Sequence, residues 1–91
     1  MALKWTAGAE RDLVRLHAFL APVNSQVAAK VVKQLVAAAE RLLTYPQLGV
    51  PLDSFAPRDV RRVTVGDYEV RYEVTEDRIY VLRLWHTRED R

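Results

Sequence analysis

Residues 58–86 have the sequence RDVRRVTVGDYEVRYEVTEDRIYVLRLWH, and this stretch decides the fold. β-branched and aromatic residues alternate with charged residues in three segments, residues 60–65, 68–74 and 78–85. The segments are separated by Gly66-Asp67 and by Thr75-Glu76-Asp77, which are typical of tight turns. This pattern predicts three successive antiparallel strands.

The middle segment shows how the two faces of this sheet should differ. One face carries apolar and aromatic side chains, Tyr68, Val70, Tyr72 and Val74, and the other carries charged ones, Glu69, Arg71 and Glu73. The apolar face needs a cover, whereas the charged face can remain partly wet. We therefore expect helices from the preceding half of the chain to pack on the apolar face.

Two helices are predicted upstream, at residues 7–20 and 25–44. In the first, leucines recur at helical spacing and Thr6 is placed to cap the N-terminus. In the second, Val27, Val31 and Leu35 share one face, Asn24 or Ser25 can cap the start, and Pro46 stops the helix. With a short strand at residues 3–6, the predicted order is β-α-α-β-β-β. The fold class is α+β, an antiparallel two-helix hairpin packed on a small antiparallel sheet, and the expected core includes Leu13, Leu16, Val31, Leu35, Val70 and Tyr72.

Composition limits the classes of protein that this chain can represent. Its 91 residues are 49% apolar and 29% charged, which predicts one folded domain over residues 1–91. There is no cysteine, and no segment approaches the ~20 apolar residues that span a bilayer, so a cytoplasmic protein without membrane contact is expected. We predict no metal site and no cofactor, since the chain has only two histidines and lacks a phosphate-binding motif.

The net charge of +2 is small, but the basic residues are unevenly distributed. Every basic residue after Lys33 is an arginine, whose planar fork of donors suits phosphate or carboxylate groups. Acidic residues lie among these arginines, so the arginines either contact an anionic partner or pair with the chain's own acids.

Four stretches, in this order, resemble the RelE/ParE family of toxins, which includes plasmid stabilisation proteins. They are LKWTAGAERDL (3–13), AAERLLTYPQLGVPL (38–52), RDVRRVTVGDYEVRYEV (58–74) and IYVLRLWHTRED (79–90). The resemblance implies the toxin of a type II toxin–antitoxin pair, a growth inhibitor that a cognate antitoxin neutralises by wrapping its helices and sheet. Members of this family either cleave mRNA on the ribosome or inhibit DNA gyrase.

The middle strand favours gyrase inhibition over RNA cleavage. In the nucleases of the family this strand typically reads Tyr or His, Arg, two apolar residues and Tyr, whereas here it reads Tyr68-Glu69-Val70-Arg71-Tyr72. A carboxylate at position 69 would repel the scissile phosphate. An mRNA endoribonuclease remains the alternative, with Arg62, Arg71 and His86 as its catalytic candidates. In that case His86 would transfer protons, although a histidine at a strand end often has a structural role.

The remaining candidates are residues that could contact a partner protein or nucleic acid. They are Arg61, Arg83, Trp85 and Arg88, of which the last three lie close to His86 in the sequence. Trp85 could stack on a partner or pack on the sheet. We expect Trp5 to belong to the core and His17 to lie on the helix surface.

Overall fold

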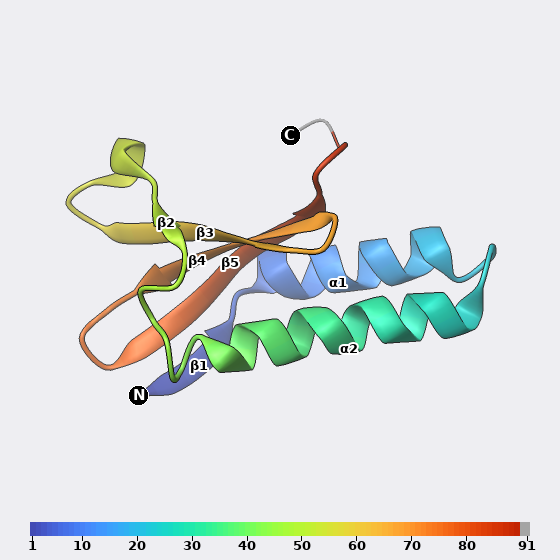
Figure 1. Cartoon of the computed structure of the whole chain (residues 1–91), viewed down its shortest axis with the longest axis horizontal. Helices are drawn as coiled ribbons and strands as arrows, with labels where there is room; N and C mark the ends of the chain where they lie inside the picture. Colours follow the sequence, from blue (N-terminus) through green and yellow to red (C-terminus); the bar gives the residue numbers. More distant parts are fainter. Residues whose placement is uncertain (90–91) are drawn as a thin grey trace.

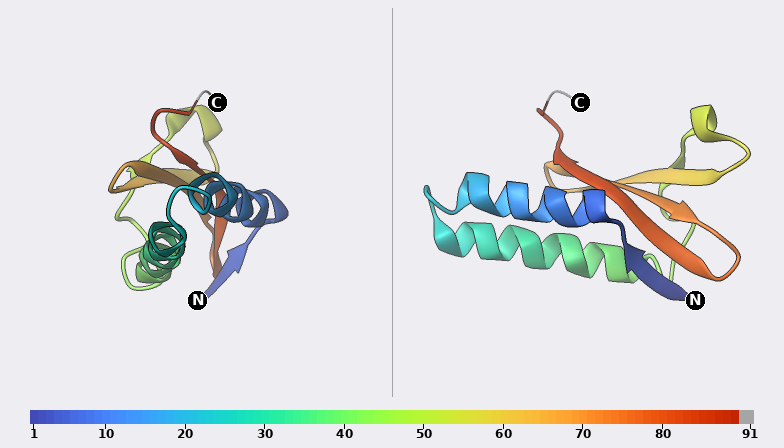
Figure 2. Two further views of the ribbon diagram at one scale, coloured as in Figure 1. Left: turned by 90° about the vertical axis from the view of Figure 1, so that its right-hand side faces the viewer. Right: turned by 180° about the vertical axis from the view of Figure 1, so that it is seen from behind.

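The computed structural model describes residues 1–89, in which two helices lie on one side of a five-stranded sheet (Figures 1 and 2). In chain order the elements are β1 (Ala2–Trp5), α1 (Ala7–Leu20), α2 (Ser25–Arg41), β2 (Val50–Pro51), the 3₁₀ helix η1 (Asp53–Phe55), β3 (Asp59–Val65), β4 (Tyr68–Val74) and β5 (Arg78–His86). The predicted α+β class and the order β-α-α-β-β-β are confirmed, with β2 and η1 as additions in the stretch expected to be a loop. Within residues 1–89 no helix is long and apolar enough to cross a membrane.

The strands lie in the order β1-β5-β4-β3-β2. The last three strands form an antiparallel meander, as predicted, and Gly66 takes a left-handed conformation with φ of +59° in the β3–β4 turn. Strand β1 joins β5 in parallel at one edge, and β2 pairs with β3 at the other. Residues 78–81 of β5 therefore have a neighbouring strand on both sides, because β1 pairs with them.

A β-bulge in β5 changes which face its last residues occupy. Arg71 of β4 pairs with Arg83, but the next residue, Tyr72, pairs with Val81, so Leu82 has no opposite residue. Strict alternation from Ile79 would place Trp85 on the helix side and His86 on the other. The extra residue reverses this assignment, because one inserted residue shifts the side-chain alternation by one position.

Local caps and turns set the helix ends. The Thr6 hydroxyl accepts from the N–H of Ala9, and the Asn24 side chain accepts from Gln26 and Val27, so Asn24 and not Ser25 caps α2. Helix α2 was predicted to reach residue 44 but ends at Arg41. Residues 42–44 instead form tight turns whose N–H groups bond to the carbonyl three residues earlier.

The core lies between the helices and the sheet. Of the six residues expected there, Leu16, Leu35, Val70 and Tyr72 are buried. The prediction was too strong for two others, Leu13 and Val31, which are half-buried and pack at the margin of the main cluster, as does Trp5. The helical hairpin extends beyond the sheet (Figure 1), and Phe19 and Val23 are exposed near its tip.

Candidate functional site

The face of the sheet opposite the helices, which we call the outer sheet face, contains Phe55, Arg58, Arg62, Glu69, Arg71, Glu73 and Trp85. Its basic residues are matched by its own acids. Arg58 donates to both carboxylate oxygens of Glu73, at 2.7 and 3.1 Å, and these hydrogen bonds lower the pKa of Glu73 despite its partial burial. Arg62 lies 4.0 Å from Glu69, whose residue is only 3% exposed. Much of the positive charge on this face is therefore neutralised internally.

Arg71 is engaged by aromatic rings. Its guanidinium carbon lies 4.9 Å from the Trp85 ring centroid and 5.4 Å from that of Phe55, which are cation–π distances. Its buried Nε makes no hydrogen bond with any residue in the described range 1–89. Trp85 is 6% exposed, so of its two predicted roles the structure supports packing on the sheet. Arg71 thus has a structural environment and does not extend freely into solvent.

Arg61 and Arg83, which were also predicted to contact a partner, form hydrogen bonds within the protein's own fold. Arg61 donates to Asp59 at 2.8 Å and to the carbonyl of Gly49 at 3.0 Å, which fastens the loop before β2. Arg83 donates to both carboxylate oxygens of Asp12 on α1, at 2.8 and 3.2 Å, and this contact raises the pKa of Arg83.

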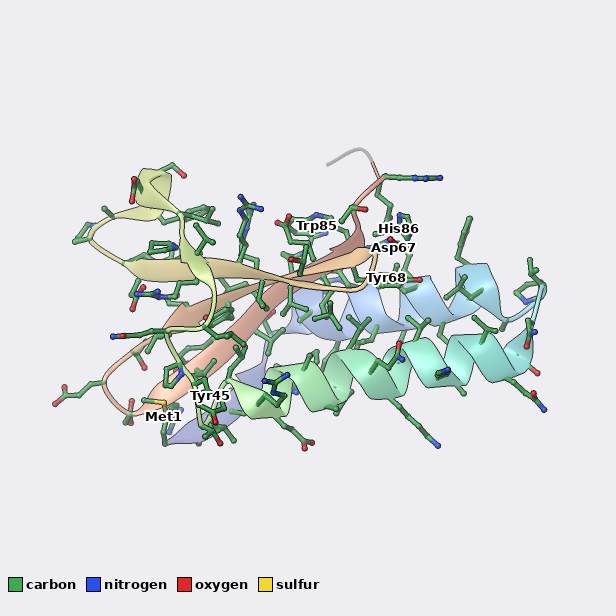
Figure 3. The ribbon with its side chains drawn as sticks, in the orientation of Figure 1. Met1, Tyr45, Asp67, Tyr68, Trp85 and His86 are labelled. Carbon is green, nitrogen blue, oxygen red and sulfur yellow. The ribbon has the colours of Figure 1, made fainter. Side chains whose placement is uncertain are left out.

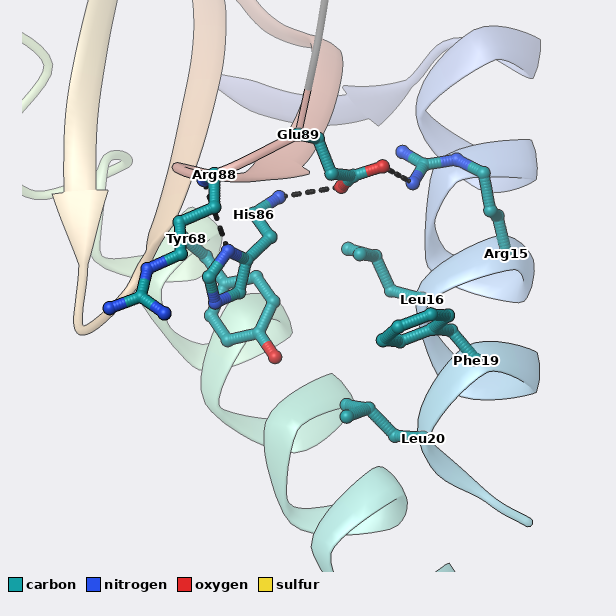
Figure 4. A pocket seen from close by; sticks show the side chains of 8 residues that line it. All are labelled: Arg15, Leu16, Phe19, Leu20, Tyr68, His86, Arg88 and Glu89. Carbon is teal, nitrogen blue, oxygen red and sulfur yellow. Dashed lines mark hydrogen bonds and ion pairs between the residues drawn. The ribbon is translucent and has the colours of Figure 1, made fainter. Parts of the chain in front are cut away.

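A concave site of about 560 Å³ lies on the other side, where the second half of α1 faces the beginning of β4 and the end of β5 (Figure 4). We call it the C-terminal groove, and it is lined by Arg15, Leu16, Phe19, Leu20, Tyr68, His86, Arg88 and Glu89. Phe19 is 79% exposed on its α1 wall. The groove therefore combines an apolar wall with a charged rim, a composition typical of protein interfaces.

His86 belongs to this groove. Its ring meets that of Tyr68 edge to face with centroids 5.2 Å apart, and Figure 3 shows the two side chains close together at the β3–β4 turn. The His86 Nδ1 accepts the backbone N–H of Arg88 at 3.1 Å, so the neutral ring carries its proton on Nε2. Burial is the largest contribution that raises the pKa of the Tyr68 hydroxyl, and the nearby negative charges of Asp67 and Glu89 raise it further.

The three catalytic candidates of the nuclease alternative are not brought together. His86 pairs with Tyr68, and Tyr68 packs against the helix-covered core. Arg62 and Arg71 project from the outer sheet face, beside Glu69 and Trp85. The sheet thus separates the imidazole from both guanidinium groups, whereas RNA cleavage needs the proton-transfer group and the phosphate-binding group at one reacting centre.

Comparison with known proteins gives this architecture a family. The family model described as "ParE toxin of type II toxin-antitoxin system, parDE" matches residues 3–91. The chain belongs to the ParE toxin family. A solved structure titled "Chromosomal ParDE TA system from P. aeruginosa" is similar, with a TM-score of 0.77 and 26% sequence identity over 94% of this chain and 95% of that one. No curated protein matches this chain significantly by sequence.

Three residues with a role in the fold or in the groove of this toxin were not predicted from the sequence, namely Asp12, Phe19 and Glu89. Asp12 had a detectable signal, because Ala9, Asp12 and Leu16 follow helical spacing and so place a carboxylate on the buried stripe of α1. No pattern in the sequence pointed to Glu89 or Phe19, since their roles depend on how close residues 86–89 lie to α1.

Among residues 1–89 no group of three His, Cys, Asp or Glu side chains could hold a metal ion.

Proposed function

We propose that this type II toxin inhibits DNA gyrase by binding to it and does not cleave RNA. One observation carries the proposal: Arg62 and Arg71 lie across the sheet from His86, and the Arg71 guanidinium is within cation–π distance of Phe55 and Trp85. The predicted proton-transfer group is therefore not placed beside the predicted phosphate-binding groups, which favours action through contact. Membership of the ParE family supports the same target.

The C-terminal groove is the surface that we propose for this contact. Arg88 lies on its rim, and its guanidinium makes no ion pair within residues 1–89, unlike Arg58, Arg61 and Arg83. An exposed aromatic residue next to an uncommitted arginine is typical of the residues that dominate protein interfaces. We therefore retain Arg88 as a partner contact, add Phe19, and assign Arg61, Arg83 and Trp85 to the fold.

A cognate antitoxin is the other partner of this toxin. The similar structure is a toxin–antitoxin system, which supports a neutralising protein for this chain as well. Because DNA gyrase acts on the chromosome, we propose that the toxin works in the cytoplasm. The match over residues 3–91 supports treating residues 1–91 as one toxin domain.

Two reactions with purified components test the proposal. The toxin should block the ATP-dependent supercoiling of relaxed plasmid by DNA gyrase, while mRNA on translating ribosomes stays intact in primer-extension mapping. His86→Ala should weaken inhibition only by the loss of its groove contacts, by about tenfold or less, because binding has no proton-transfer step. If the toxin is a ribosome-dependent mRNA endonuclease, it will leave gyrase active and cut mRNA at codon positions, and His86→Ala will slow that cleavage by roughly 10²–10⁴-fold.

A further inference from the structure

The edge of β5 is closed by side chains where β1 ends. Among residues 1–89 no strand pairs with this edge past residue 81, yet four successive backbone groups find partners. The Leu82 carbonyl accepts from Thr6, the Leu84 N–H donates to Asp12, the Leu84 carbonyl accepts from Arg15, and the His86 N–H donates to Glu89. Of the first three side chains, Thr6 caps α1, and Asp12 and Arg15 lie within that helix. The fourth comes from the C-terminal segment itself.

Glu89 joins that segment to the helix. Its Oε1 accepts the His86 N–H at 2.7 Å, and its Oε2 is ion-paired with Arg15 of α1 (Figure 4). Its own N–H donates to the His86 carbonyl at 2.9 Å, and the Thr87 N–H donates to the carbonyl of Asp67 at 2.8 Å. Residues 86–89 are thereby folded into a compact turn that lies between the β3–β4 turn and α1.

This turn fixes the position of the Arg88 backbone. The Arg88 N–H is bound to His86 Nδ1, but its side chain has no ion pair within the described part of the chain. The backbone of Arg88 is therefore held on both sides while its guanidinium is left for another molecule. Holding the backbone from which this cation extends lowers part of the entropic cost of binding an anionic partner group.

We propose that Glu89 is a positioning residue, which holds residues 86–89 against α1 so that Arg88 can meet a carboxylate on the target protein. This inference rests on the proposed contact at the C-terminal groove. Both carboxylate oxygens of Glu89 bind the toxin's own groups, so we assign its effect on the target to Arg88. Without Glu89 the turn loses both its link to Arg15 and the acceptor for the His86 N–H, and Arg88 becomes mobile.

Amide hydrogen exchange on the purified toxin tests the positioning step. In Glu89→Ala the His86 amide should exchange about tenfold faster or more, since it loses its acceptor at an otherwise open edge. The Leu84 amide, which Asp12 holds, should change little. Glu89→Gln keeps an acceptor oxygen, so its His86 amide should exchange nearly as slowly as in the wild type. Glu76→Ala, which removes an exposed carboxylate elsewhere, is the matched control. Unchanged exchange at His86 in Glu89→Ala overturns the proposal, as does an equal rise at Leu84, which would indicate general destabilisation.

Inhibition of DNA gyrase tests the link to Arg88. Glu89→Ala and Arg88→Ala should each weaken inhibition by about 3–10-fold and make it less sensitive to salt. The double variant should be no weaker than Arg88→Ala alone, because a residue that acts through another gives non-additive effects. Additive losses overturn the link. If the wild-type toxin leaves gyrase active, the proposed function fails, whereas the exchange at His86 still decides whether Glu89 holds the turn.

Discussion

The buried carboxylate of Asp12, on helix α1, accepts the backbone N–H of Leu84 at 2.8 Å and the side chain of Arg83 at the same distance. A helix side chain thus replaces the neighbouring strand that β5 lacks at this point. Because the Asp12 residue is only 3% exposed and Leu84 is buried, water cannot readily replace Asp12 as the acceptor of the Leu84 N–H.

Replacing Asp12 with Ala should therefore lower the free energy of unfolding by about 1–3 kcal/mol, the usual cost of a buried N–H left without an acceptor. Urea denaturation followed by circular dichroism measures this change. Asp53→Ala serves as the control, since Asp53 is exposed and within residues 1–89 forms hydrogen bonds only through its backbone. Equal midpoints for the two variants would show that the Asp12–Leu84 bond contributes nothing to stability.

The same carboxylate makes the toxin less stable in acid. Burial alone would raise the pKa of Asp12, but hydrogen bonds from Arg83, Leu84 and Arg15 outweigh it and hold the pKa below its ordinary value. The folded state therefore binds this proton less readily than the unfolded state. The stabilisation is complete above the ordinary aspartate pKa of about 3.9 and is lost as pH falls through the lower folded value.

Urea midpoints measured from pH 7 down to pH 2 will show this loss below about pH 4–5. Asp12→Asn should lose less stability over the same range, while some acid dependence remains because Arg58 also lowers the pKa of Glu73. An identical pH profile for Asp12→Asn and the wild type would contradict the assignment.

Tyr72 should be sensitive to the loss of a single oxygen atom. Its hydroxyl donates to the carbonyl of Pro46 and accepts the N–H of Gly49, both at 2.8 Å, and so anchors the loop after α2. Tyr72→Phe leaves both backbone groups unpaired, and we expect a loss of about 1–3 kcal/mol in the free energy of unfolding. Tyr80→Phe is the matched control, since no hydrogen bond to that hydroxyl is seen within residues 1–89. A loss as large in Tyr80→Phe would refute the specific role of the Tyr72 hydroxyl.

Phe19 should matter for binding and not for folding. Its side chain is largely exposed in the free toxin but lines the C-terminal groove, so Phe19→Ala should leave the unfolding midpoint within about 0.5 kcal/mol of the wild type. Inhibition of DNA gyrase should fall by the equivalent of about 1–4 kcal/mol, as for other central interface residues. Val23→Ala, exposed but outside the groove, should change neither. Full inhibition by Phe19→Ala would exclude the groove as the contact surface.

More of the secondary structure than of the candidate site could be predicted from the sequence. Strand β4 was predicted at its observed bounds, and Thr6 was predicted as the cap of α1, because alternation and capping depend on residues close in the chain. The end of α2 was placed three residues late, since a stretch of helical periodicity continues into the turns at residues 42–44. Strand β2 and helix η1 were missed because each is only two or three residues long.

The sequence by itself determined the order of the elements, the two faces of β4 and the resemblance to a toxin family, all of which are local patterns or their succession. Only the tertiary structure decided that His86 faces the helices while Arg71 stacks on Trp85 on the opposite face. The physical reason is the β-bulge at Leu82, which shifts the side-chain alternation by one residue. No local pattern marks that bulge, because it depends on how β5 pairs with β4 while α1 packs on its edge through Asp12, more than seventy residues earlier in the chain.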